Sequence, residues 1–142
     1  YLGYYLKWTP QEVYYYAVEN CGFRPRPFRT MGTYGKYHSI DDKIDDIHFY
    51  TTYIKFGIGR ATYDVFQEIR NDHLTTEEGK KLIKKYDGEY PSRYIKDICD
   101  YLNMTKSEFD KHCDKFRSPH LWKKIKNNWK LRHTCNYDGC ED

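Results

Sequence analysis

The sequence lacks the features of membrane and secreted proteins. Its longest apolar runs fall well short of the roughly 20 residues that cross a bilayer, and no secretory signal peptide is visible. Five cysteines make an odd number, and none of them forms a Cys-x-x-Cys pair; they are Cys21, Cys99, Cys113, Cys135 and Cys140. This usage indicates reduced thiols, so we expect a cytoplasmic protein without membrane contacts.

Several catalytic and binding signatures are also missing. There is no Gly-x-Ser-x-Gly elbow, no Walker spacing and no trustworthy Cys/His pattern for nucleophilic catalysis. The net charge of +3 is too small to require nucleic acid as a partner. Aromatic residues, by contrast, make up 18% of the chain and include 16 tyrosines. We therefore expect an aromatic core whose tyrosine hydroxyls need partners, and ring surfaces suited to sugars or nucleobases.

Helix-start signals define most of the chain. Thr9, Thr75 and Thr105 each precede a glutamate by three residues, as in a capping box. Ser39 is a further expected N-cap, with Asp41 in a favourable first turn. The resulting helices are expected at about 10–20, 39–56, 61–70, 75–86, 91–102 (from Pro91 or Ser92) and 105–116, with Ala61, Val65, Phe66 and Ile69 buried in the third.

The remaining segments predict little additional structure. Residues 1–6 are expected to form a short strand, and 23–37 a long loop of the kind that often carries function. Trp122–Lys126 and Trp129–His133 flank Asn127-Asn128, which predicts a β-hairpin, and Thr134–Asp142 looks like a tail. The fold class is therefore mainly α. Because the chain opens on Tyr1 in an apolar segment, we expect it to be a fragment of a longer protein.

The stretch from Lys55 to Thr62 is the most informative part of the chain. Gly57 and Gly59 stand between Lys55 and Arg60, at the junction of two expected helices. Glycine allows close approach of a ligand to the backbone, and the cations can hold phosphate or carboxylate. The alternative is a helix end with glycine caps and solvated charges.

Other candidate sites are weaker. The loop Gly32–Ser39 enters an expected helix N-terminus and carries Lys36, which suits an anion. Asp41, Asp42, Asp45 and Asp46 are spaced to share a helix face and hold magnesium, although aspartate is also simply favourable at a helix start. His133 with Cys135 and Cys140 offers metal ligands at an unusual spacing, and a frayed tail explains them better.

A basic segment lies near the C-terminus. Between residues 111 and 132 there are eight lysines and arginines but a single acid, Asp114, with Trp122 and Trp129 among them. Such a pattern can bind single-stranded nucleic acid. A solvated basic edge that discourages strand pairing explains it more simply.

In combination, several segments resemble the C-terminal part of the bacterial N-acetyl sugar amidotransferases. They are Gly32-Thr33-Tyr34 with Lys36-Tyr37, Ser39-Ile40-Asp41-Asp42-Lys43, Tyr53 to Thr62, Glu68-Ile69-Arg70 with His73-Leu74-Thr75, Lys85 to Glu89, and Phe116 to Trp122. The likeness covers about residues 4–133. The chain is similar to the helical half of these enzymes, and residues 1–22 would be the strand–helix end of their α/β nucleotide-binding fold.

The resemblance implies a place in lipopolysaccharide O-antigen or flagellin glycan biosynthesis. Family members convert an acetamido group of a sugar nucleotide into an acetamidino group, using ATP with Mg²⁺ and ammonia from a glutaminase partner. Their PP-loop of Ser-Gly-Gly-x-Asp-Ser type and their N-terminal cysteine cluster are absent from these 142 residues. We therefore expect the chain alone to be inactive.

The site residues expected from this resemblance fall into two groups. Lys55, Arg60 and His73 are the expected catalytic residues, and the expected substrate or nucleotide contacts are Lys36, Tyr37, Gly57, Gly59, Glu68, Arg70, Asp87 and Glu89; no metal ligand is assigned. The cations would face developing phosphate charge. The alternative function is a non-catalytic helical module that binds nucleic acid or a protein partner.

Overall fold

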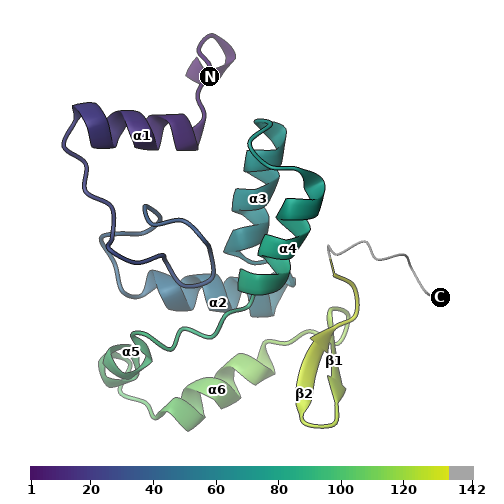
Figure 1. The fold of residues 1–142 in the computed structure, drawn as a ribbon. Helices are drawn as coiled ribbons and strands as arrows, with labels where there is room; N and C mark the ends of the chain where they lie inside the picture. Colours follow the sequence, from purple (N-terminus) through teal and green to yellow (C-terminus); the bar gives the residue numbers. More distant parts are fainter. Residues whose placement is uncertain (135–142) are drawn as a thin grey trace.

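The computed structural model describes residues 1–134, and this part of the chain is mainly helical with one hairpin (Figure 1). The helices are α1 (Pro10–Asn20), α2 (Asp45–Phe56), α3 (Arg60–Arg70), α4 (Thr76–Tyr86), α5 (Ile95–Tyr101) and α6 (Lys106–Lys115), and the strands are β1 (Trp122–Ile125) and β2 (Asn128–Leu131). The predicted fold class is confirmed. No helix of the described residues is long and apolar enough to cross a bilayer.

The N-terminal strand was a wrong prediction. Leu2–Tyr4 forms a 3₁₀ turn, η1, and the aromatic side chains around it are exposed, with Tyr4 at 86% and Tyr5 at 79%. A strand needs a neighbour with which to share hydrogen bonds. Within residues 1–134 the two strands pair only with each other, so the apolar start has no sheet to join.

The core lies between α2, α5 and α6. Ile47 and Ile54 of α2 pack against Ile98 and Cys99 of α5 and against Phe109 of α6. The expected aromatic core is present in part: Phe49, Phe109 and Trp122 are buried, but no tyrosine of the described residues is. Tyrosine rings instead lie at the edges of the core, where their hydroxyls reach polar partners; Tyr90, for example, donates to Asp110 at 2.9 Å.

The helix starts that were predicted from capping boxes agree with the structure. Thr75 and Thr105 form complete capping boxes with Glu78 and Glu108. Thr9 is the N-cap of α1 as expected, but its hydroxyl bonds the Glu12 carboxylate and not a backbone N–H. Two other helices begin later than expected, α2 at Asp45 and α5 at Ile95.

The late start of α2 has a local cause. Ser39 does not cap it, because its φ of 49° is left-handed and Asp42 Oδ1 accepts from the Ile44 N–H at 2.7 Å. The Asp42 side chain therefore closes a turn that delays the helix. Asp41 and Asp42 consequently precede α2 and do not share a helix face with Asp45 and Asp46, which corrects that prediction.

The hairpin is present, but its turn is shifted by one residue. Ile125 pairs with Asn128, so the two-residue turn is Lys126-Asn127, with Lys126 at a φ of 54°. This register turns Trp122 inward, where its indole N–H donates to the Ile54 carbonyl at 2.7 Å. A slip by one residue would turn Trp122 outward, so this buried bond opposes the Asn127-Asn128 turn.

Helices α3 and α4 form a second packed unit beside the core (Figure 1). Ala61 and Val65 are fully buried as predicted, whereas Phe66 is 45% exposed and Ile69 half-buried. The close packing depends on Gly79, where a Cβ would lie 2.6 Å from Val65. Because α4 covers only one face of α3, the other face is left to line a cavity.

Two glycines with the same backbone conformation test the packing around α4. Gly88 has φ +74° and an added Cβ would lie 2.2 Å from the Tyr53 ring, whereas Gly22 has φ +67° and open space around it. We expect Gly22→Ala to cost about 1–2 kcal/mol for the left-handed backbone alone. Gly88→Ala should cost about 1–3 kcal/mol more, because the Tyr53 ring must move.

Urea unfolding of both glycine variants and the parent chain gives this comparison. Equal losses of unfolding free energy in the two variants would contradict the packing of Gly88 against Tyr53.

Candidate functional site

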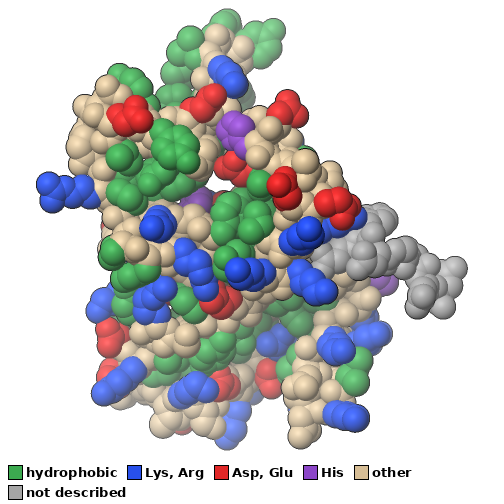
Figure 2. Space-filling model, viewed as in Figure 1, with side chains coloured by type: hydrophobic (Ala, Val, Ile, Leu, Met, Phe, Trp, Pro, Cys, Tyr) green, Lys and Arg blue, Asp and Glu red, His purple; other side chains and the backbone are tan. Residues whose placement is uncertain are grey.

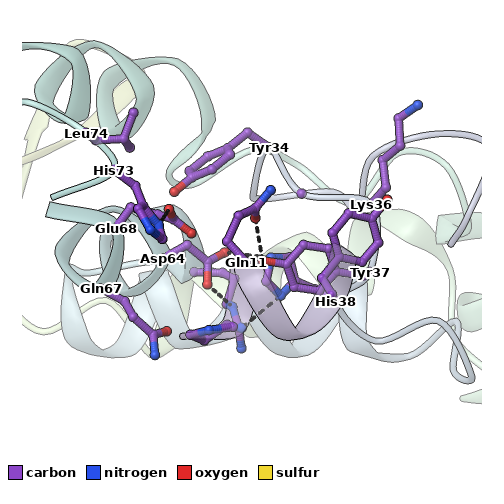
Figure 3. A pocket seen from close by; sticks show the side chains of 14 residues that line it. Gln11, Tyr34, Lys36, Tyr37, His38, Asp64, Gln67, Glu68, His73 and Leu74 are labelled. Carbon is purple, nitrogen blue, oxygen red and sulfur yellow. Dashed lines mark hydrogen bonds and ion pairs between the residues drawn. The ribbon is translucent and has the colours of Figure 1, made fainter. Parts of the chain in front are cut away.

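A cavity of about 600 Å³ opens between α1, the loop before α2 and the free face of α3. Figure 2 shows this hollow in the space-filling view, with histidine side chains at its edge. Figure 3 shows the side chains around it; the lining residues are Pro10, Gln11, Tyr14, Tyr34, Gly35, Lys36, Tyr37, His38, Arg60, Asp64, Gln67, Glu68, His73 and Leu74. The cavity brings together three segments that are far apart in the sequence.

One face of α3 supplies the polar wall. Arg60, Asp64, Gln67 and Glu68 follow the i, i+4, i+7, i+8 spacing that aligns side chains on a helix. Arg60 Nε donates to Asp64 Oδ1 at 2.9 Å, and the Thr33 hydroxyl donates to Asp64 Oδ2 at 2.5 Å. Asp64 therefore fixes both the Arg60 side chain and the loop that faces it.

His38 is held at both ring nitrogens. Its Nδ1 lies 3.0 Å from Arg60 Nη2, and its Nε2 lies 3.4 Å from Asp64 Oδ2. A guanidinium only donates, so Nδ1 accepts and the proton of the neutral ring is on Nε2. Burial lowers the pKa of His38, and Arg60 lowers it further against the opposing effect of Asp64. His38 is thus fixed as a neutral ring with no nitrogen free for a ligand.

The Glu68–His73 pair is built by the end of α3. Asp72 adopts a left-handed φ of 59°, His73 N–H donates to the Glu68 carbonyl at 2.9 Å, and Asp72 N–H donates to the Ile69 carbonyl at 3.1 Å. These bonds form a Schellman motif, which returns the chain over the last turn of the helix. As a result, His73 Nδ1 lies 2.8 Å from Glu68 Oε2.

The chemical state of His73 differs from that of His38. A carboxylate accepts the proton on Nδ1, which leaves the Nε2 lone pair of the neutral ring available. Nε2 has no hydrogen-bond partner among residues 1–134. A carboxylate–imidazole pair of this kind is the arrangement by which enzymes orient a general base.

Tyrosine rings form the wall on the α1 side. Tyr37 stacks on Tyr14 with ring centroids 4.4 Å apart, and its hydroxyl lies 3.0 Å from Gln11 Oε1. Burial, together with the charges of Glu68 and Asp64, raises the pKa of Tyr37 to about 12. Tyr34 differs, because its hydroxyl is buried with no hydrogen-bond partner in the described structure, and burial also raises its pKa.

The expected cations are distributed unequally. Arg60 lies in the cavity with its charge near His38, and Lys36 lines the rim, with its chain extending away from the other labelled side chains in Figure 3. Lys55 is exposed at the end of α2 and lines a different groove. Arg70 is exposed in the last turn of α3 and does not line the cavity. The structure therefore separates Lys55 and Arg70 from Arg60.

The link between α2 and α3 contains Gly57 and Gly59, and the carboxylate of Asp87 binds its backbone. This contact positions Arg60. Gly57, with φ 74°, ends α2, and Gly59 precedes α3. The Asp87 carboxylate accepts from the Gly59 N–H at 3.0 Å and the Thr62 N–H at 3.1 Å, and from the Thr62 hydroxyl. A Cβ on Gly59 would lie 2.6 Å from Asp87 Oδ1. The free N–H groups of this helix start are thus held by Asp87.

Glu89 also has a partner within the fold. Arg29 pairs with it through both guanidinium nitrogens, and the Gly32 N–H donates to it at 2.9 Å. Burial alone would raise the pKa of Glu89, but these donors outweigh it and lower the pKa. Asp87 and Glu89 therefore lie outside the cavity, and each ties the end of α4 to another segment.

The loop Gly32–Ser39 does not meet a helix N-terminus in the way the sequence suggested. It runs into turns, and α2 begins only at Asp45. The loop instead contacts the start of α3, where the Ala61 N–H donates to the Gly32 carbonyl at 3.1 Å. Gly35 leaves room for the His38 ring, because a Cβ at residue 35 would lie 2.4 Å from His38 Nε2.

Sequence reasoning missed several cavity residues. His38 and Tyr34 lay inside a loop considered for its glycines, and Gln11 and Gln67 are polar residues on helices with no motif around them. Asp64 carried one usable signal, since it follows Arg60 by four residues on the same helix face. The remaining neighbours come from tertiary packing alone.

The other candidate sites also have defined surroundings. Asp46 is turned inward, with Oδ1 4.0 Å from Arg26 Nη1, and residues 1–134 contain no group of three potential ligands placed to hold a metal ion. Trp122 is buried, and the Arg117 guanidinium stacks over it at 4.3 Å. Cys135, Cys140 and most of the expected tail lie outside the described residues.

The two cavity tyrosines predict opposite effects on stability. Tyr37→Phe removes the bond to Gln11 and should cost about 0.5–1.5 kcal/mol of unfolding free energy. Tyr34→Phe removes a hydroxyl that is buried without a partner, so we expect no loss or a small gain. Urea unfolding of both variants provides the measurement, and a loss in Tyr34→Phe equal to that in Tyr37→Phe would refute the unpaired hydroxyl.

His38 predicts a pH dependence of stability. Its folded-state pKa lies below the ordinary value of 6.5, so only the unfolded chain takes up the proton as the pH falls through that range. The contribution of neutral His38 is present above about pH 6.5 and is lost toward the folded pKa. We expect His38→Asn to reduce the loss of unfolding free energy between about pH 7.5 and pH 5.

The ring signals of His38 in an NMR titration provide a direct check. A midpoint at or above that of a free histidine would contradict the assignment of a buried, neutral ring.

Comparison with known proteins identifies the family to which the cavity-lining segments belong. Residues 31–135 match the family model described as "LPS biosynthesis protein WbpG-like, C-terminal domain". No match to a curated protein was found. The matched segment contains the loop, α3 and the Glu68–His73 pair, whereas α1 precedes it. Since the match spans well over half of the chain, this protein belongs to the WbpG-like C-terminal domain family of lipopolysaccharide biosynthesis proteins.

Proposed function

We propose that this chain is the acceptor-binding part of an ATP-dependent N-acetyl sugar amidotransferase of lipopolysaccharide O-antigen or flagellin glycan biosynthesis. The observation that carries the proposal is that the Glu68–His73 pair and Arg60 line one cavity of a chain from this family. The substrate class is a sugar nucleotide with an acetamido group. The reaction replaces the acetamido oxygen by nitrogen to give an acetamidino group.

The role of His73 follows from the proton balance. Ammonia attacks the acetamido carbon with its lone pair, and the C–O bond breaks as the oxygen, activated at the expense of ATP, leaves as part of AMP. The new C–N bond puts positive charge on the former ammonia nitrogen, which must lose a proton. His73 Nε2, with Nδ1 held by Glu68, accepts that proton, and Glu68 stabilises the resulting imidazolium.

Arg60 and the ring wall orient the acceptor. Asp64 and His38 fix the Arg60 guanidinium in the cavity, and a positioned guanidinium suits a phosphate or sugar carboxylate. The Tyr37 ring stacks on Tyr14 and also lies 4.4 Å from the centre of the His38 ring, so these rings form a rigid wall against which a sugar can pack. Gln11 and Gln67 line the same space with amide groups for hydroxyl contacts.

The nucleotide and its magnesium fit this chain poorly. At the start of α3, Asp87 holds the N–H groups of Gly59 and Thr62, and the Gly32 carbonyl holds that of Ala61. No three potential metal ligands cluster in residues 1–134. We infer that ATP, which makes the acetamido oxygen a leaving group, binds to another segment of the enzyme with a phosphate loop. The glutaminase partner would deliver ammonia to the His73 side of the cavity.

The test is product formation by the enzyme that contains this chain. With ATP, Mg²⁺, ammonium chloride and an acetamido sugar nucleotide, we expect AMP and an amidine in equal amounts. AMP is followed by chromatography and the amidine by its mass decrease of about one unit, since oxygen is replaced by NH. ATP consumption that is independent of the acetamido group would refute the proposal.

Substitution of His73 gives the sharper prediction. His73→Gln should lower kcat/KM by about 10²–10⁴ if it is the general base, and Glu68→Gln should cost part of this amount. Added imidazole should restore part of the activity of His73→Gln. His120→Gln is the matched control, since His120 is exposed beside the hairpin and does not line the cavity.

An unchanged kcat in His73→Gln, with only KM raised, would assign His73 to binding and overturn its role as the base.

A further inference from the structure

A second concave surface lies between α2 and α6, away from the cavity. It encloses about 450 Å³ and is lined by large apolar side chains, among them Phe56, Leu102, Met104 and Phe116. Phe56 is 55% exposed, Leu102 43% and Phe116 67%. Exposed apolar side chains that gather in one groove mark an interaction surface, whereas scattered ones do not. We call this surface the α2–α6 groove.

Among the described residues that line the groove, Lys55 is the one with a formal charge. His48, Lys55 and His112 line it, each is exposed, and no acidic residue does so. None of the three has an ion-pair partner among residues 1–134; the ammonium of Lys55 lies 5.2 Å from the centre of the Phe56 ring. The groove therefore fits an apolar segment that carries negative charge.

Helix α1 of this chain has that composition. Glu12, Tyr15, Tyr16 and Glu19 follow the i, i+3, i+4, i+7 spacing of one helix face, and all four are exposed. Tyr15 is 55% and Tyr16 64% exposed, and α1 contains no lysine or arginine. Glu12 already pairs with Lys7, whereas Glu19 has no ion-pair partner in the described structure.

α1 is positioned away from the groove of its own molecule. Its opposite face packs on the loop through Tyr14, whose ring stacks on Tyr37, and no residue of α1 is buried. Figure 1 shows α1 and α6 at opposite ends of the molecule. The outward face of α1 is therefore free for another molecule.

We propose that α1 of one copy of this chain docks in the α2–α6 groove of a second copy. Tyr15 and Tyr16 then contact Phe56 and Phe116, and Glu19 faces Lys55. This is helix-in-groove recognition, in which residues at i, i+3, i+4 and i+7 anchor an amphipathic helix. Because the other face of α1 lines the cavity through Gln11 and Tyr14, the contact also fixes one wall of the candidate site.

The experiment measures the mass of the chain in solution by sedimentation velocity over a range of concentrations. We expect a concentration-dependent increase above the monomer mass of 17.3 kDa. Phe116→Ser should weaken association about tenfold or more, as for a central apolar contact. Lys55→Glu and Glu19→Lys should each weaken it about threefold to tenfold.

The two charge variants also test each other. An equal mixture of Lys55→Glu and Glu19→Lys should associate more strongly than either variant alone, because the groove of the first then matches the helix of the second. Lys84→Glu, the same charge change at an exposed position of α4, should have no effect.

A monomer at every concentration would overturn the proposal, whatever other molecule the groove binds. Equal weakening by Lys84→Glu and Lys55→Glu would also overturn it, since net charge and not the groove would then govern association.

Discussion

The Asp87 carboxylate is the constraint on which the rest of the site depends. It lies just beyond the end of α4 and holds the backbone N–H groups at the start of α3, so the two helices are joined end to start as well as along their sides. Its negative charge interacts favourably with the positive end of the α3 dipole. Burial raises the pKa of Asp87, and the hydrogen bonds it accepts from Thr62 and Gly59 act in the opposite direction. With α3 fixed in this way, Arg60 and Glu68 face the cavity from opposite ends of one helix.

This arrangement explains why Lys55 and Arg60, so close in sequence, serve different surfaces. Gly57 ends α2 in a left-handed conformation, and the chain turns before α3 begins. Lys55 consequently stays with the α2–α6 groove, while Arg60 enters the cavity. The glycine pair did indicate a close approach of an anion to the backbone. The anion is a side chain of the same fold, and its source 28 residues further along the chain was not visible from the local pattern.

Local chemistry thus predicted more of the structure than long-range chemistry. The capping boxes at Thr75 and Thr105 fixed two helix starts, because every partner lies within three residues. Ser39 failed as a cap because Asp42 competes for the backbone, and the hairpin turn shifted because Trp122 is anchored on Ile54. The Glu68–His73 pair was within reach, since its geometry comes from one helix end. His38 and Tyr34 were not, because their neighbours are set by how the loop folds onto α3.

The two cavity histidines show how this framework divides chemical roles between like residues. His38 has one nitrogen facing a cation and the other facing an anion, so protonation of Nδ1 would remove the contact with Arg60, and the neutral ring serves to hold Arg60. His73 has one nitrogen on a carboxylate and the other without a partner in the described structure, so gain of a proton strengthens its existing contact. Burial lowers the pKa of His38, and the neighbouring Arg60 lowers it further. The cavity therefore combines a fixed guanidinium, at Arg60, with an available ring nitrogen, at His73. A site that must hold an anionic acceptor and remove a proton needs both of these conditions together.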